Sequence, residues 1–181
     1  KFSAVHQVIV FNLKVTAKDA GNHNLPSGSV VCVDDVVTYT SVLDPINVTT
    51  DIQWQRAPQG TPEDSPAWQN FTLSSNQDYK ETTPGDFDVR VRARIGNDAC
   101  YSAPYNIKVA SIQIEVKDAA GTVLESESII CKGDTLTYTG SIVPSTVRIS
   151  LIQWERSDRG QNDWHLFGNA RVITQSFTEN T

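Results

Sequence analysis

The chain has 181 residues, of which 20% are charged, and its formal net charge at neutral pH is −6. An acidic chain lacks the basic electrostatic surface that nucleic-acid binding needs, so we expect no nucleic-acid partner. No apolar run approaches the roughly 18 residues of a membrane-spanning helix, so we expect no membrane insertion. Valine, isoleucine and threonine are frequent, and Gly, Pro, Asn, Asp and Ser cluster between them. This pattern predicts an all-β chain of short strands and turns.

The predicted strands recur along the chain with a period of about 99 residues. Residues 31–40 return as 130–139, with Cys, Asp, Thr, Tyr and Thr in the same order. The central strand Ile52–Arg56 returns as Ile152–Arg156, shifted by 100, and Trp68 returns as Trp164, shifted by 96. Such a period indicates that one structural unit is used more than once, and here that unit has the size of a domain.

The phase of the period predicts three segments. Residues 1–10 correspond to 101–109 and would form the closing strand of a preceding repeat. Residues 11–109 would form a complete repeat, and residues 110–181 a partial repeat that lacks its last strands. We expect neighbouring repeats of a longer array, or other copies of the chain, to be its partners. In the second case the N-terminal strand would fill the gap in the next copy.

The strand over residues 87–95 carries three arginines on one face. Phe87, Val89, Val91, Ala93 and Ile95 alternate with them and predict the buried face. The outward arginines have two interpretations: a solvated face with weak cross-strand pairs, or a contact surface for acidic glycans or carboxylates. The residues of this candidate ligand surface are Arg90, Arg92 and Arg94.

Four tryptophans fall at two repeated positions. Trp54 and Trp154 follow an isoleucine by two residues, which predicts that they point into the core. Trp68 and Trp164 each follow a polar turn. They would either close a hairpin against the sheet or form exposed platforms that stack on sugar rings.

The three cysteines follow the same phase. Cys32 opens a strand near the start of the complete repeat, Cys100 lies near its end, and Cys131 repeats Cys32. If each repeat of a longer array contains one disulfide, a piece cut out of that array can contain an odd number of cysteines. We therefore predict a Cys32–Cys100 disulfide with Cys131 unpaired; the alternative is a pair of buried free thiols.

Cys32, Trp54 22 residues later, and Cys100 near the end of about 100 residues suggest an immunoglobulin-like sandwich. The chain more closely resembles the immunoglobulin-like repeats of large secreted and surface proteins of the Bacteroidota. The matching segments are Cys131–Asp134, Gln53–Gln55 with Gln153–Glu155, Trp68–Phe71 with Trp164–Phe167, Phe87–Val91, and Asn97–Cys100; the first repeat departs from the pattern at Val33–Asp34. The resemblance implies tandem immunoglobulin-like β-sandwich domains, the second incomplete. It also implies that the chain belongs to one of four kinds of protein: adhesins, gliding-type surface filaments, stalks, or accessory modules of type IX-secreted enzymes.

No catalytic, metal or cofactor motif stands out. His6, His23 and His165 are far apart and have no His or Cys at metal-ligand spacing. Four acidic residues have two interpretations: they would provide oxygen ligands for calcium, or they would form turns and carry solvated charge. They are Asp34, Asp35, Asp86 and Asp88. We expect no catalytic residue, metal or cofactor.

These observations predict a non-catalytic, extracellular or cell-surface protein. Its role would be structural or adhesive, as a segment of a larger surface protein or fibre. The alternative is a carbohydrate- or protein-binding accessory module of a secreted hydrolase. Exposure of Trp68 and Trp164 is the feature that separates the two.

Overall fold

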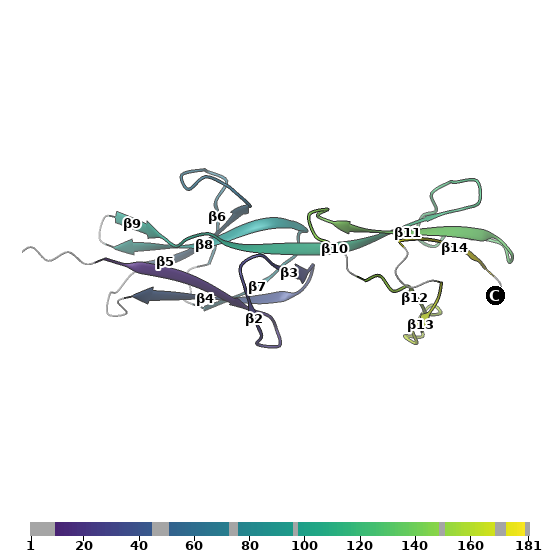
Figure 1. Ribbon diagram of the computed structural model, residues 1–181, viewed down its shortest axis with the longest axis horizontal. Coiled ribbons are helices and arrows are strands. Elements are labelled where there is room, and N and C mark those ends of the chain that lie inside the picture. Colours follow the sequence, from purple (N-terminus) through teal and green to yellow (C-terminus); the bar gives the residue numbers. More distant parts are fainter. Residues whose placement is uncertain are drawn as a thin grey trace, which may run out of the picture. The chain divides into compact units, whose positions relative to one another are not determined.

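The computed structural model describes residues 10–44, 51–72, 76–95, 98–148, 151–168 and 173–179. Every regular element in these residues is a strand, and the strands are connected by turns and loops (Figure 1). The prediction of an all-β chain is therefore confirmed. The chain divides into two compact units, residues 1–110 (unit 1) and residues 111–181 (unit 2). Within the described residues no helix is long and apolar enough to cross a membrane.

Unit 1 consists of two facing sheets with a common core. One sheet has the order β2-β1-β4-β7, with β1 at Asn12–Lys18, β2 at Asn24–Leu25, β4 at Val36–Asp44 and β7 at Asn76–Lys80. The other has the order β6-β5-β8-β10, with β5 at Asp51–Pro58, β6 at Gln69–Thr72, β8 at Gly85–Ile95 and β10 at Tyr105–Lys117. Two short strands complete it: β3 (Ser29–Cys32) runs parallel to β10, and β9 (Asp98–Tyr101) pairs with β8.

The alternation predicted for β8 positions the core of unit 1. Val89, Val91 and Ala93 are completely buried, and Val91 stands opposite the equally buried Trp54 of β5. Burying one such side chain stabilises a fold by roughly 1.5–3 kcal/mol. The core also contains an aromatic cluster of Tyr39, Trp54, Phe71 and Tyr79, whose contacting rings lie 4.9–6.4 Å apart between centroids.

Unit 2 contains a similar set of strands. Residues 111–117 of β10 pair with β11 (Thr135–Val143), which pairs with β14 (Thr174–Thr178). A separate ribbon joins β12 (Glu155–Arg156) to β13 (His165–Leu166). An aromatic cluster of Tyr138, Trp154, Phe167 and Phe177 lies within this unit, with ring centroids 5.5–6.2 Å apart.

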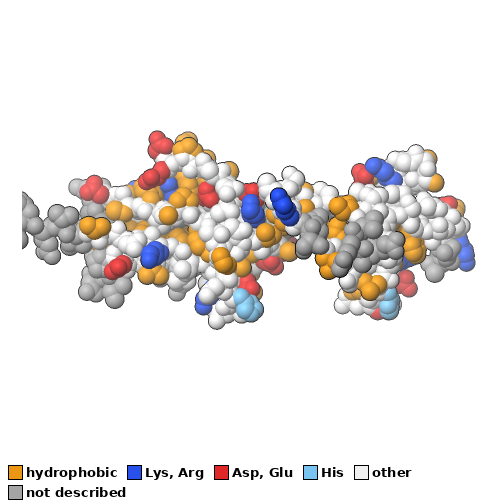
Figure 2. All heavy atoms as spheres, viewed as in Figure 1, with side chains coloured by type: hydrophobic (Ala, Val, Ile, Leu, Met, Phe, Trp, Pro, Cys, Tyr) orange, Lys and Arg blue, Asp and Glu red, His pale blue; other side chains and the backbone are white. Residues whose placement is uncertain are grey.

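The two units differ in how well their apolar residues are covered. Leu13 of β1 is 8% exposed, whereas Ile112 of β10 is 75% exposed and Ile114 is 62% exposed. Figure 2 shows hydrophobic side chains at the surface of both units, so the difference lies in these particular residues. The closing strand predicted over residues 1–10 lies outside the described residues except for Val10, whose side chain is exposed.

Candidate functional site

The predicted ligand surface of unit 1 is built around a buried arginine. Arg90 points outward from β8, and its guanidinium lies 3.9 Å from the ring centroid of Trp68 and 4.2 Å from that of Tyr101. Its Nε donates a hydrogen bond of 2.9 Å to Oε1 of Gln55 on the neighbouring strand. Burial lowers the pKa of Arg90. These contacts hold the arginine against the sheet, and it is only 4% exposed.

Trp68 serves as the cover of that arginine. The indole is 8% exposed, and its Nε1 donates a hydrogen bond of 2.8 Å to the carbonyl of Pro62 in the preceding turn. A ring that stacks on a sugar needs an open face, and Trp68 offers none. Its position matches the interpretation that it closes the hairpin, and the sugar-platform interpretation is wrong for this residue.

The other two arginines of β8 are progressively more open. Arg92 is half-buried opposite Gln53, and Arg94 is exposed opposite Asp51. Together these residues line a shallow pocket of about 160 Å³. The Nε of Arg92 is buried and has no hydrogen-bond partner among the described residues. A cationic surface on β8 that contacts anionic ligands would therefore consist of Arg92 and Arg94 without Arg90.

Trp164 of unit 2 differs from Trp68 in its surroundings. Its side chain is 61% exposed, and its Nε1 donates to Oδ1 of Asn162 at 3.1 Å. It lines an open pocket of about 500 Å³ together with Trp154, Arg156 and Phe167. No strand of unit 2 in the described part of the chain places an arginine over this ring.

The predicted Cys32–Cys100 disulfide is wrong, because all three cysteines are free. Cys32 stands opposite Ala110, one residue beyond the Val109–Gly85 pair. Cys100 stands opposite Ala93, eight residues further along β8. At about 3.3 Å per residue the two cysteines lie more than about 25 Å apart, whereas bridged cysteines need α-carbons within about 7 Å.

Alkylation without reduction is expected to label all three cysteines. Cys32 and Cys131 are exposed and Cys100 is half-buried, so the first two should react faster in the folded chain. Peptide mass mapping with timed iodoacetamide labelling measures this order. A disulfide-linked peptide joining Cys32 to Cys100 would contradict the strand register of unit 1.

A buried network that the sequence analysis missed joins Tyr39, Arg56 and Glu81. The hydroxyl of Tyr39 donates to Oε1 of Glu81 at 2.9 Å, and Nη2 of Arg56 donates to Oε2 at 2.7 Å. Glu81 is 1% exposed. The guanidinium of Arg56 also lies 3.4 Å from the ring centroid of Phe87. Burial raises the pKa of Tyr39, and the negative charge of Glu81 raises it further.

The same network occurs in unit 2. The hydroxyl of Tyr138 donates to Oε1 of Glu179 at 2.8 Å, and Nη1 of Arg156 donates to Oε2 at 2.5 Å. The glutamates also bond alike through the backbone: Glu81 accepts from Asp34 and Glu179 from Gly133, both at 2.6 Å. A signal for the network existed in the sequence, because Tyr, Arg and Glu recur here at shifts of 99, 100 and 98 residues.

The network in unit 2 predicts a loss of stability at alkaline pH. Burial, with the hydrogen bond to Glu179, raises the pKa of Tyr138 from 10.0 to about 12. A raised pKa of the folded state means that this stabilisation is complete below about pH 10 and is lost as pH rises through about 12. The absorbance of tyrosinate is measured as a function of pH for the wild type and for Tyr138→Phe. The difference between the two curves should have its midpoint near pH 12. A difference curve centred at 10 would contradict the bond.

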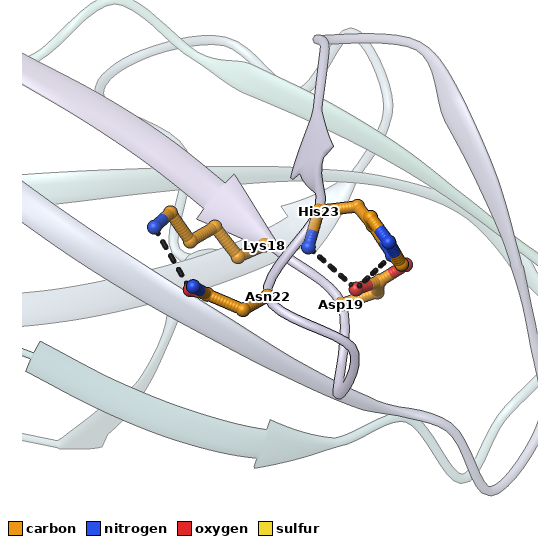
Figure 3. A network of polar contacts seen from close by, with 4 residues as sticks. All are labelled: Lys18, Asp19, Asn22 and His23. Carbon is orange, nitrogen blue, oxygen red and sulfur yellow. Dashed lines mark hydrogen bonds and ion pairs between the residues drawn. The ribbon is translucent and has the colours of Figure 1, made fainter.

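His23 lies in the turn that follows β1 (Figure 3). The Asp19 carboxylate accepts a hydrogen bond of 2.8 Å from the backbone N–H of His23 and lies 3.0 Å from its Nδ1, while Lys18 donates to Asn22 at 2.9 Å. The backbone bond from His23 lowers the pKa of Asp19. Unit 2 repeats the turn, with Thr122 N–H donating to Asp118 at 2.8 Å. These contacts describe a turn rather than a reaction centre.

No group of three or more metal-ligand residues occurs among the described residues. His6 lies outside them, and His165 lies 3.5 Å from Asp163. The four aspartates considered for calcium are all engaged within the protein. Asp34 pairs with Lys80, Asp35 accepts from Cys32 N–H, Asp86 pairs with Lys108, and Asp88 accepts from Gly60 N–H. Their contacts are those of turns and cross-strand pairs.

Comparison with protein-family models and with curated proteins finds no match to this chain.

Proposed function

We propose that the chain is a segment of a non-catalytic, extracellular array of tandem immunoglobulin-like domains with a structural or adhesive role. The observation that carries this proposal is that a Tyr–Glu–Arg network around a buried glutamate recurs in both units. A buried carboxylate destabilises the fold unless each of its partners is present in the right geometry. Two unrelated units are therefore not expected to share the same arrangement. Its recurrence supports a common origin of the two units as repeats of one domain.

The strand registers support the same conclusion. In unit 1 Leu13 pairs with Leu43, and in unit 2 Ile112 pairs with Ile142, so both partners shift by 99 residues. The turn before the next strand also matches. The backbone N–H groups of Cys32 and Cys131 donate to the aspartates three residues later, both at 2.7 Å. Domains repeated in this way are typical of proteins that space or display other modules.

The immunoglobulin-like part of the proposal rests on unit 1. About 100 residues form two packed sheets, with Trp54 buried on a central strand. This combination is typical of immunoglobulin-like sandwiches. Because fold does not imply function, the extracellular role rests on the resemblance to repeats of Bacteroidota surface proteins.

Surface labelling tests the proposal. An antibody raised against unit 1 is expected to label intact cells of the source organism, and brief external protease treatment should remove the label. Mass spectrometry of the captured polypeptide should reveal further copies of the repeat. Labelling that appears only after cells are permeabilised would contradict the proposed location.

A carbohydrate-binding accessory module remains the second candidate, because Trp164 is an exposed aromatic ring beside an open pocket. Such rings can stack on sugars. A glycan array probed with the wild type and with Trp164→Ala tests this candidate. Binding that the substitution abolishes would favour it over a purely structural role.

A further inference from the structure

Two outward arginines of β8 stand opposite glutamines of β5 but differ in their hydrogen bonds. The Nε of Arg90 donates to Oε1 of Gln55 at 2.9 Å. Arg92 stands opposite Gln53, whose amide donates to the carbonyl of Thr72 at 2.7 Å. The Nε of Arg92 is buried and has no acceptor among the described residues. The sheet thus leaves one charged donor unsatisfied at this position.

The positive charge of this site is also incompletely balanced. The exposed Arg94 lies two residues further along β8 and lines the same pocket of about 160 Å³ as Arg92 and Gln53. Asp51, opposite Arg94, contributes a single carboxylate to the wall. Neither arginine forms an ion pair within the described part of the chain. Two guanidinium groups and one carboxylate leave an excess of positive charge.

A carboxylate ligand would answer both deficits. A buried charged donor without an acceptor destabilises a fold, and such a group calls for a bound water, ion or ligand. Water would satisfy the hydrogen bond of Arg92 but would not balance the charge of the two arginines. A carboxylate does both, because its oxygens accept in the plane of the guanidinium group. The pocket has the volume of roughly five water molecules, which suits one such group with the rest of its ligand outside.

The place of the pocket in the sheet favours a glycan over a polypeptide. At residues 92–94 strand β8 is flanked by β5 on one side and by β9 on the other. A peptide therefore cannot add to β8 here as an extra strand, and it would lose the backbone hydrogen bonds that give strand addition its affinity. The outer face offers side-chain guanidinium and amide groups instead. A sugar that carries a carboxylate and several hydroxyls can be recognised by such groups alone.

We infer that Arg92 and Arg94 form a binding site for the carboxylate of an acidic glycan, with uronic acid residues as the ligand class. The Nε of Arg92 donates to one carboxylate oxygen, and the guanidinium of Arg94 pairs with the other. Arg90 takes no part, because Trp68 and Tyr101 cover it. The inference rests on the adhesive form of the proposed function and deepens it by naming a ligand and a site.

The direct experiment observes the Arg92 side chain as the ligand is added. Trigalacturonate is titrated into the isotope-labelled 181-residue protein at low salt, and the arginine Nε–H signals are followed by NMR. The Arg92 signal is expected to shift because its proton gains an acceptor. The Arg90 signal should stay in place, since Gln55 already accepts from it. The fully methyl-esterified trisaccharide has no negative charge and is expected to bind at least about tenfold more weakly.

Substitutions separate the geometry of the guanidinium group from its charge. Arg92→Lys keeps the charge and should weaken trigalacturonate binding about tenfold, and Arg94→Gln at an exposed position should have a similar effect. Gln53→Glu should abolish binding, because the protein then supplies a carboxylate opposite Arg92 itself. Arg159→Gln is the matched control. It removes an exposed arginine of unit 2 that pairs with Glu127, and the affinity should not change.

Five results would overturn the inference. They are absence of trigalacturonate binding, equal binding of the methyl ester, an unchanged Arg92 signal in the complex, equal weakening by Arg159→Gln, and tighter binding of tetraglutamate than of trigalacturonate. The last would assign the site to an acidic polypeptide. The titration uses purified protein, so its failure would leave a structural role standing. The surface-labelling experiment judges the proposed function separately.

Discussion

Trp54→Ala is expected to lower the free energy of unfolding of unit 1 by about 3–5 kcal/mol. The indole is completely buried, and its ring contacts those of Tyr39 and Phe71 at centroid distances of 5.8 and 6.2 Å. Truncation removes these contacts and leaves a cavity between two sheets that are held apart by the remaining core. Urea denaturation followed by far-ultraviolet circular dichroism measures the change in midpoint and slope.

Trp164→Ala is the matched control for this substitution. It removes the same side chain from a site that is 61% exposed, and surface substitutions usually change stability by less than about 0.5 kcal/mol. Equal losses from Trp54→Ala and Trp164→Ala would contradict the burial difference between the two tryptophans. The comparison also guards against a general effect of losing an indole on the spectroscopic signal.

Glu81→Ala is expected to destabilise unit 1 by about 3–5 kcal/mol, because it leaves the charge of Arg56 without its partner in a largely buried site. The Tyr39 hydroxyl loses its acceptor in the same step. Glu81→Gln should cost less, since the amide oxygen still accepts one hydrogen bond while the ion pair is lost. Urea denaturation of the three proteins at neutral pH gives the order.

Tyr39→Phe separates the two halves of the network. It removes only the hydroxyl and leaves the Arg56–Glu81 pair at 2.7 Å intact, so its expected cost is about 1 kcal/mol. A Glu81→Ala protein no less stable than Tyr39→Phe would show that the ion pair contributes nothing. Glu63→Gln, at an exposed position in the turn before Trp68, should leave stability unchanged.

Local patterns explain which strands could be predicted. The period of two along β8 assigns Val89, Val91 and Ala93 to the core because successive side chains of any strand point to opposite faces. The buried Trp54 followed from its position between apolar and polar neighbours. These assignments need no knowledge of which strands are neighbours, and the structure agrees with them.

The prediction of a Cys32–Cys100 disulfide was wrong because it depends on which strands are neighbours. The phase of the repeat related Cys32 to Cys131, but it contained no information on which end of the sheet Cys100 occupies. The pairing of β9 with the far end of β8 decides that position. The same applies to Arg90, whose outward direction was readable but whose burial depends on Trp68 and Tyr101 arriving from other segments.

The sequence by itself determined the all-β class, the repeated motifs and the inward faces of the strands, because each follows from side-chain periodicity or direct comparison along the chain. Only the tertiary structure decided the state of the cysteines, the Tyr39–Arg56–Glu81 network and the contrast between a covered Trp68 and an open Trp164. Each of these depends on strand register between segments far apart in sequence, and register is set by the packing of the whole sandwich rather than by any local pattern.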